Sequence, residues 1–157
     1  MDVRPLEPGE RPWMLAEIAR RWHGTTVARR GEAVRIEDLA ALVAVESEER
    51  VGLLCYAMEL HQIEVVTIDS FRPGLGVGSA LLEAAARTGR LAGCWRMWLV
   101  TTSDNVQALG FYLRRGMRVV SVHHDAVAGA RLKKPTIPRE GETGIAIEDE
   151  IELERWL

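Results

Sequence analysis

The stretch that decides the fold is Arg72-Pro73-Gly74-Leu75-Gly76-Val77-Gly78-Ser79, with three glycines at alternate positions directly before a helical pattern. Glycine permits backbone conformations with positive φ and lets the backbone approach a ligand closely. The first N–H groups of a helix have no partner within the helix, and they lie at the positive end of its dipole. The stretch therefore predicts an anion cradle between a strand and a helix.

Two familiar nucleotide motifs do not fit this stretch. A P-loop requires Lys and then Ser or Thr after its last glycine, whereas Gly78 is followed directly by Ser79. A dinucleotide fingerprint, G-x-G-x-x-G, would need a third glycine where the sequence has Ser79 or Leu81. On these residues alone, a tight strand-to-helix turn that binds no ligand remains an alternative.

The sequence around the turn predicts antiparallel strands first and a β-α-β-α-β half after them. Strand-like patterns mark residues 25–29, 42–45, 51–58, 63–68, 95–101 and 118–123, and helical spacing marks the segments after 77 and 105. A first helix begins at Pro12 and ends near Gly24. Near the C-terminus Ile145–Leu153 alternates apolar with acidic residues, which predicts a last strand with one face in solvent. We expect an α+β (mixed α/β) fold in a single domain over residues 1–157.

The composition excludes several classes of partner. A net charge of −3 over 157 residues offers no basic surplus for a phosphate backbone, so we expect no nucleic acid partner. Neither a signal peptide nor an apolar run of membrane-spanning length is present, so we expect a cytoplasmic protein with no membrane partner. Cys55 and Cys94 lie in apolar stretches, which favours two buried reduced thiols.

A second motif follows the turn: Asn105-Val106-Gln107-Ala108-Leu109-Gly110-Phe111-Tyr112-Leu113-Arg114-Arg115-Gly116-Met117. Ala108, Phe111 and Tyr112 are spaced i, i+3 and i+4, so they share one helical face. With the turn, this motif resembles the GNAT family of N-acetyltransferases. That family's coenzyme A signature is Gln/Arg-x-x-Gly-x-Gly/Ala; its two small positions fall on Gly76 and Gly78, and Pro73 stands where Gln or Arg is usual.

The resemblance implies a fold and a cosubstrate. The fold would be a GNAT-like, mixed twisted sheet of six or seven strands flanked by about four helices, and the cosubstrate would be acetyl-CoA. Backbone groups of Val66, Thr67 and Ile68 would bind the pantetheine arm. Further contacts implied by the resemblance are Pro73, Gly74, Leu75, Gly76, Val77, Gly78 and Ser79 in the turn, with Asn105 and Phe111 in the second motif. Capping of its own helix is an equally good role for Asn105.

The resemblance also implies catalytic residues. Tyr112 would be the general acid, because a phenol with a pKa of about 10 can protonate a leaving thiolate; a core tyrosine is the alternative. Glu64 would be the general base acting through water, and a solvent-facing strand residue is the alternative. Glu59, Glu148, Glu150 and Glu152 are further candidates for the base.

The predicted reaction is direct transfer of an acetyl group to a primary amine of a small molecule or peptide. The alternative is a non-catalytic acyl-CoA-binding or regulatory module on the same fold. His123-His124-Asp125 does not predict a metal site, because adjacent strand residues point to opposite faces; we expect no metal. A homodimer is compatible with the resemblance, and the Ile145–Leu153 strand would be its edge.

Overall fold

The computed structural model describes residues 1–157. It contains a seven-stranded main sheet, a separate two-stranded sheet and four α-helices, so the predicted mixed α+β class is confirmed. Contacts divide the chain into two compact units. The first unit comprises Met1–Glu17, Glu37–Met97 and Trp156–Leu157, and the second comprises Ile18–Ile36 and Trp98–Arg155.

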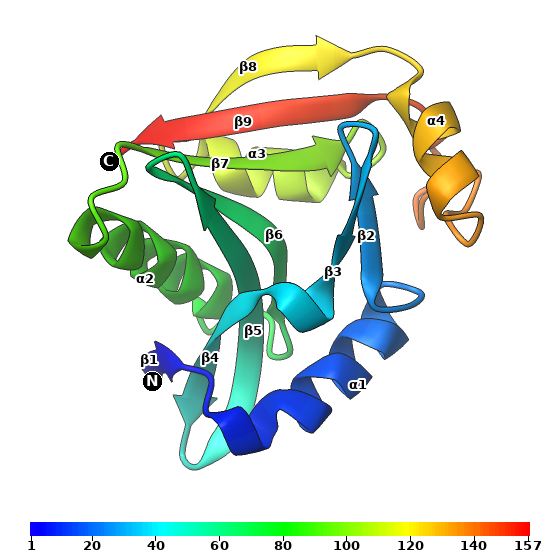
Figure 1. Ribbon diagram of the computed structural model, residues 1–157. Coiled ribbons are helices and arrows are strands. Elements are labelled where there is room, and N and C mark those ends of the chain that lie inside the picture. The colour runs from blue at the N-terminus through cyan, green and yellow to red at the C-terminus, as the bar shows by residue number, and fades with distance from the viewer. The chain divides into compact units, whose positions relative to one another are not determined.

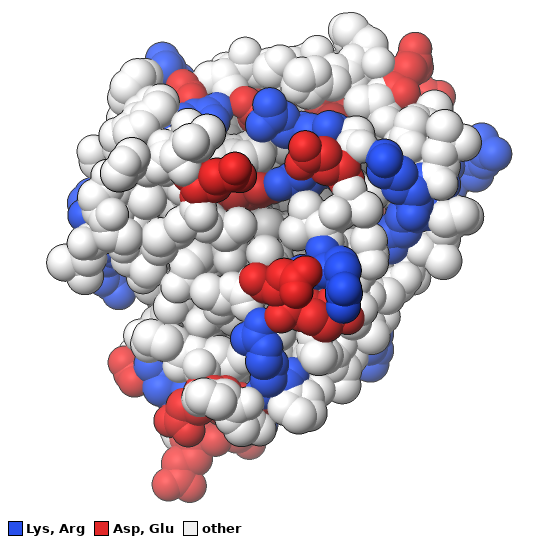
Figure 2. Space-filling model, in the orientation of Figure 1, with Lys and Arg blue, Asp and Glu red and all other residues white.

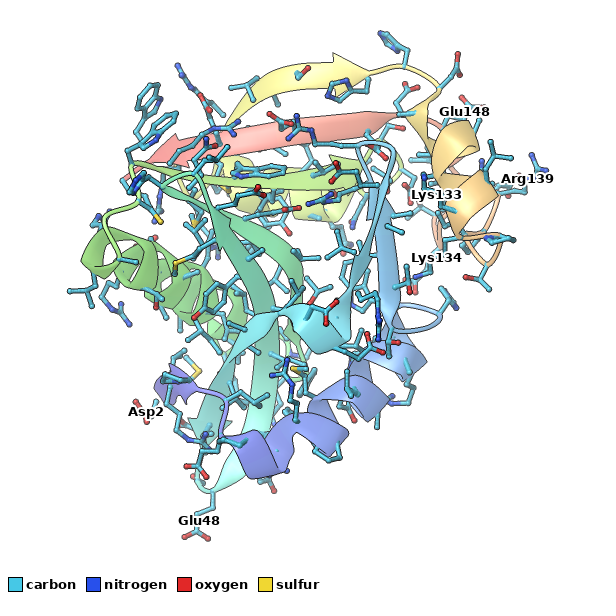
Figure 3. The ribbon with its side chains drawn as sticks, in the orientation of Figure 1. Asp2, Glu48, Lys133, Lys134, Arg139 and Glu148 are labelled. Atoms are coloured by element: carbon cyan, nitrogen blue, oxygen red, sulfur yellow. The ribbon has the colours of Figure 1, made fainter.

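Four antiparallel strands of the main sheet lie in the first unit, in the order β1-β4-β5-β6 (Figure 1). Their bounds are β1 Asp2–Pro5, β4 Ala40–Glu46, β5 Glu49–Glu59 and β6 Gln62–Ser70. Ser47 and Glu48 connect β4 to β5, and Glu48 projects from the tip of this hairpin (Figure 3). Both residues have positive φ, 48° and 68°, as in a type I′ turn, whose twist matches that of the strands it joins.

The core of the first unit lies between α2 (Val77–Leu91) and strands β4, β5 and β6, on which the helix packs (Figure 1). Helical spacing places Leu81 and Ala85 on one face of α2, and both are fully buried. Leu53 and Leu54 of β5 are fully buried as well. Each such leucine contributes roughly 1.5–3 kcal/mol of hydrophobic stabilisation, so α2 is held firmly at its place on the sheet.

The helical segments before β4 are short. A 3-10 turn at Pro8–Glu10 leads into α1 (Arg11–Arg21), and a second 3-10 turn occupies Ile36–Asp38. Arg11 donates hydrogen bonds to the carbonyl oxygens of Glu37 (2.5 Å) and Leu39 (2.8 Å), which ties the start of α1 to the chain entering β4.

The second unit contains the other three strands of the main sheet, in the order β7-β9-β8, and a separate hairpin. The strands are β7 Arg96–Thr102, β8 Arg118–His123, β9 Glu150–Trp156 and, in the hairpin, β2 Thr26–Arg29 and β3 Glu32–Arg35. Of these residues only Arg96, Met97 and Trp156 belong to the first unit. The helices are α3 (Val106–Leu113) and α4 (Ala126–Lys133), and α4 packs against the hairpin. At the end of α4, Lys134 Nζ donates to the carbonyl oxygen of Trp22, 2.5 Å away (Figure 3).

The expectations for the C-terminal strand need three corrections. Its regular part begins at Glu150 and not at Ile145, because residues 145–149 form only an isolated bridge at Ala146. Its acidic face is not in solvent, since Glu150, Glu152 and Glu154 are only 2%, 8% and 7% exposed. Moreover, β9 lies between β7 and β8, so β8 is the edge strand of this unit.

Two further features complete the description. Cys55 and Cys94 are free, buried thiols, as predicted. None of the helices combines the length and the apolar character that crossing a membrane requires. Strands β1 and β3 and helix α4 are additions to the predicted set of elements.

Candidate functional site

The candidate site in the first unit begins on β6, where the strand is irregular. In the pairing of β5 with β6, Tyr56 lies opposite Val65 and Cys55 opposite Thr67, so Val66 has no partner on β5. This is a β-bulge, which adds one residue to a strand and re-aims the backbone locally. Bulges are over-represented beside active sites. The bulge therefore falls at the start of the stretch from Val66 to Ile68 that was predicted to contact the cosubstrate.

Two polar side chains on the same strand are buried. Glu64 is 6% exposed and engaged in interactions, so its alternative role as a solvent-facing residue is wrong. Thr67 is 1% exposed and lies opposite Cys55 on the facing strand, and its buried hydroxyl oxygen has no hydrogen-bond partner within the chain. Burial raises the pKa of the Cys55 thiol to about 11. Cys55 is therefore protonated and unreactive at neutral pH, which argues against a covalent role for it.

The chain leaves β6 and turns into α2 through the glycine-rich stretch. Gly74 and Gly76 have positive φ, 83° and 71°, and Gly76 is the residue that precedes the first turn of α2. Its carbonyl accepts the N–H of Ala80 at 3.0 Å. A Cβ added at either glycine would meet nothing within 4 Å, so open space lies next to the backbone there.

The start of α2 has the electrostatics of an anion site. No acidic side chain lies in its first turn, so nothing within the helix neutralises the positive end of the dipole. Val77 is buried at 1% and fixes this turn on the sheet. Arg72, before the turn, forms an ion pair with Glu49 of β5. The groups at the helix start are therefore its backbone N–H groups. The residues present thus fit a pyrophosphate group.

The candidate residues of the second unit lie on α3. Asn105 precedes the helix, and its side chain accepts the N–H of Ala108 at 3.2 Å, so the capping role is confirmed. Tyr112 is 7% exposed and contacts the ring of Phe111, with ring centres 5.3 Å apart. The guanidinium of Arg115 lies 3.7 Å from the centre of the Phe111 ring and donates to the Phe111 carbonyl at 3.0 Å.

The predicted site residues thus fall into two sets. The first unit brings together Glu64, the bulge and the glycine-rich turn, all within one strand and the start of the next helix. The second unit holds Phe111 and Tyr112 on one short helix, with Asn105 as its cap. No group of three His, Cys, Asp or Glu side chains is placed to hold a metal ion.

Comparisons with known proteins bear on the family of the chain. The model of the Acetyltransferase (GNAT) family matches residues 7–117. The uncharacterized protein YdhI of Bacillus subtilis (strain 168) is 37% identical over 140 residues, 88% of each chain.

Solved structures share the fold at low sequence identity. An acetyltransferase of Bacillus subtilis in complex with CoA has a TM-score of 0.72 at 17% identity, over 99% of this chain and 97% of that one. A GNAT family acetyltransferase of Elizabethkingia anophelis with acetyl-CoA bound has a TM-score of 0.72 at 16% identity, again over 99% and 97%. With the family model covering most of the chain, these findings establish that the protein belongs to the GNAT acetyltransferase family.

Proposed function

We propose that this chain transfers the acetyl group of acetyl-CoA directly to a primary amine of a small molecule or peptide. The proposal rests on three features that follow one another along the chain in the first unit. They are a bulge at Val66, an open glycine turn, and a helix start without an acidic side chain. Membership of the family supports the reaction class, and two structural neighbours are named as complexes with CoA or acetyl-CoA.

In this proposal the backbone of the chain does most of the binding. The N–H groups at the start of α2 hold the pyrophosphate of the cosubstrate. The bulge at Val66 frees backbone groups from the β5–β6 ladder, and such groups can hydrogen-bond the pantetheine arm and polarise the thioester carbonyl. Burial of Val66 and Thr67 side chains keeps those backbone groups in a fixed position.

Two side chains would move the protons. Glu64 accepts, through water, the proton that the amine must lose before its nitrogen bonds to the carbonyl carbon. As the carbon–sulfur bond breaks, Tyr112 gives its phenolic proton to the departing thiolate. The nitrogen, now bonded to the carbonyl carbon, loses its second proton to solvent, and solvent reprotonates the phenolate. Glu64 and Tyr112 are each largely buried within their own unit, at 6% and 7% exposure.

The experiment compares the only two tyrosines of the chain, Tyr56 and Tyr112. Acetyl transfer to a panel of amines is followed by release of the CoA thiol, and calorimetry measures acetyl-CoA binding. Tyr112→Phe is expected to lower kcat by about 100-fold or more with acetyl-CoA affinity unchanged, because general acid catalysis contributes that much. Tyr56→Phe, the matched control, is expected to leave both quantities unchanged.

Two outcomes would contradict the proposal. If acetyl-CoA binds but Tyr112→Phe turns over any amine as fast as the original chain, Tyr112 is not the acid. If acetyl-CoA binds and no amine is acetylated, the chain is a non-catalytic acyl-CoA-binding or regulatory module.

A further inference from the structure

The hydroxyl group of Thr67, on β6 of the first unit, is buried and has no partner. The residue is 1% exposed, and its Oγ1 neither donates a hydrogen bond to another group of the chain nor accepts one. A buried hydroxyl without a hydrogen bond is costly, and ordered water is the common partner of buried polar groups that the chain itself does not satisfy. The Thr67 hydroxyl therefore indicates a position for water beside β6.

The bulge on β6 brings the side chains of Thr67 and Glu64 to the same face of the sheet. In a regular strand, residues three positions apart point to opposite faces. Here Thr67 lies opposite Cys55 and Glu64 lies opposite Ala57, because the bulge adds Val66 to the strand between them. Cys55 and Ala57 are two positions apart on β5 and share a face, and residues directly opposite each other in a sheet share it too.

The shared face is the one directed away from α2. A Cβ added at Gly89 of α2 would lie 2.8 Å from Cγ2 of Ile63, so Ile63 points toward this helix. Its neighbour Glu64 points to the other face, and Thr67 does so as well. Both side chains therefore flank Val66, the bulge residue whose backbone is proposed to bind the cosubstrate, and they lie in the same unit as the glycine-rich turn.

The spacing of the two side chains suits a single bridging water. Two positions along β5 correspond to about 6.5 Å, and a water that bonds two groups at about 2.8 Å each spans polar atoms up to about 5.6 Å apart. Acidic side chains at the tip of the β4–β5 hairpin project into solvent (Figure 2), whereas Glu64 is 6% exposed. A carboxylate offers about four acceptor positions, so Glu64 can bond a water in addition to its other partners.

We infer that Thr67 and Glu64 together hold one ordered water, and that Thr67 is a positioning residue for the general base. This inference rests on the proposed function. When one O–H of the water bonds the Glu64 carboxylate and the other bonds the Thr67 oxygen, a lone pair of the water is left for an N–H of the acceptor ammonium. The ammonium gives a proton to the water while the water gives one to Glu64, so the amine becomes neutral, Glu64 becomes protonated and the water is regenerated. Without the hydroxyl the water can turn, and fewer complexes have a lone pair directed at the amine.

The first test is a crystal structure of the chain at a resolution that shows ordered water. The inference expects a water within about 3.2 Å of both Thr67 Oγ1 and a carboxylate oxygen of Glu64. In crystals of Thr67→Val, which replaces the hydroxyl by a methyl group of similar size, this water should be lost or displaced. A Thr67 hydroxyl that bonds no water in the original chain would overturn the inference whatever the chain acetylates.

The second test is a double-mutant cycle on acetyl transfer to the amine of the panel that is acetylated fastest. Thr67→Val is expected to lower kcat about tenfold, as the loss of one hydrogen bond does, with acetyl-CoA affinity unchanged in calorimetry. Thr67→Ser restores a hydroxyl and should stay within about threefold of the original chain. In the Glu64→Gln background Thr67→Val should lower kcat by less than about twofold, because its effect passes through Glu64, whereas a loss of packing would add to that of Glu64→Gln.

Cys55→Ala is the matched control, because Cys55 lies directly opposite Thr67 and is fully buried. Its kcat is expected to match that of the original chain. A tenfold loss in Cys55→Ala would mean that the thiol, and not a water, is the partner of the hydroxyl. That result, unchanged turnover in Thr67→Val, or additive losses in the cycle would overturn the inference and leave the proposed function standing. If the original chain binds acetyl-CoA and acetylates no amine, the proposed function fails and the role of the water fails with it. Should Thr67→Val fail to fold, by circular dichroism, Thr67→Ala takes its place under the same criteria.

Discussion

Gly52 on β5 connects the packing of the sheet to the candidate anion site, and its replacement makes a sharp prediction. A Cβ added at Gly52 would overlap Cγ1 of Val77, the first residue of α2, and would lie 2.9 Å from the carbonyl oxygen of Asp69 and 3.0 Å from Cδ1 of Leu81. An ordinary contact needs 3.4–4 Å. The Asp69 oxygen belongs to the β6 backbone, so the helix side must yield, by about one ångström at Val77.

The cost can be estimated from overpacking. An extra methyl group in a packed core costs about 1–3 kcal/mol, and for a chain of this length about 2 kcal/mol corresponds to a fall in Tm of roughly 4–8 °C. Because Val77 begins α2, the same displacement moves the N–H groups that would hold the pyrophosphate. We therefore expect Gly52→Ala to weaken acetyl-CoA binding by about tenfold, about 1.4 kcal/mol, as well as to lower Tm.

Denaturant unfolding and calorimetry with acetyl-CoA measure the two effects. In the double variant Gly52→Ala/Val77→Ala the clashing Cγ1 is absent, so the loss in unfolding free energy should be about 1–2 kcal/mol smaller than the sum of the single losses. Gly129→Ala is the control: Gly129 lies in α4 with nothing within 4 Å of an added Cβ, and alanine there should not destabilise. A Tm of Gly52→Ala within about 1 °C of the original, or strictly additive losses, would refute the reasoning.

Two further predictions concern titratable groups of the first unit. The hydrogen bonds from Arg4 (2.8 and 3.0 Å), with one from Arg50 (2.9 Å), lower the pKa of Glu10 to about 2. Since the pKa of Glu10 is lower in the folded chain than in the unfolded chain, the free energy of unfolding should fall as pH drops from about 4.5 to about 2. Urea unfolding of Glu10→Gln should show a weaker dependence on pH over this range. At pH 7 the substitution should cost about 1–2 kcal/mol after solvent screening. Burial raises the pKa of Cys55 to about 11, so a thiol reagent at pH 8 should label it only upon unfolding, and rapid labelling of the folded chain would contradict its burial.

The glycine-rich turn and the helix cap of the candidate site could be predicted from the sequence because their signals are local. Gly74 and Gly76 determine the backbone conformation of their own turn, and the apolar spacing after Val77 determines the helix that follows. The cap at Asn105 depends on a residue only three positions away. Such features need no knowledge of which strand pairs with which.

The remainder of the site depends on contacts between residues distant in sequence. The bulge at Val66 is a register shift against β5, and nothing in the residues of β6 alone indicates it. Alternating Ile and Glu in β9 predicts one face in solvent, yet that face is covered by partners such as Arg30 and Arg118. Arg30 lies 122 positions before Glu152, so only the folded chain brings their charges together.

The difference between the part of the site that the sequence predicts and the part that it does not has a chemical basis. A pyrophosphate is bound by backbone N–H groups, which every residue offers, so its site needs glycines and a helix start and leaves a short motif in the sequence. An acceptor is recognised by side chains, and side chains that face one site from different strands are far apart in the sequence and leave no short motif. Chains that share the glycine-rich turn can accordingly differ in the amines they acetylate.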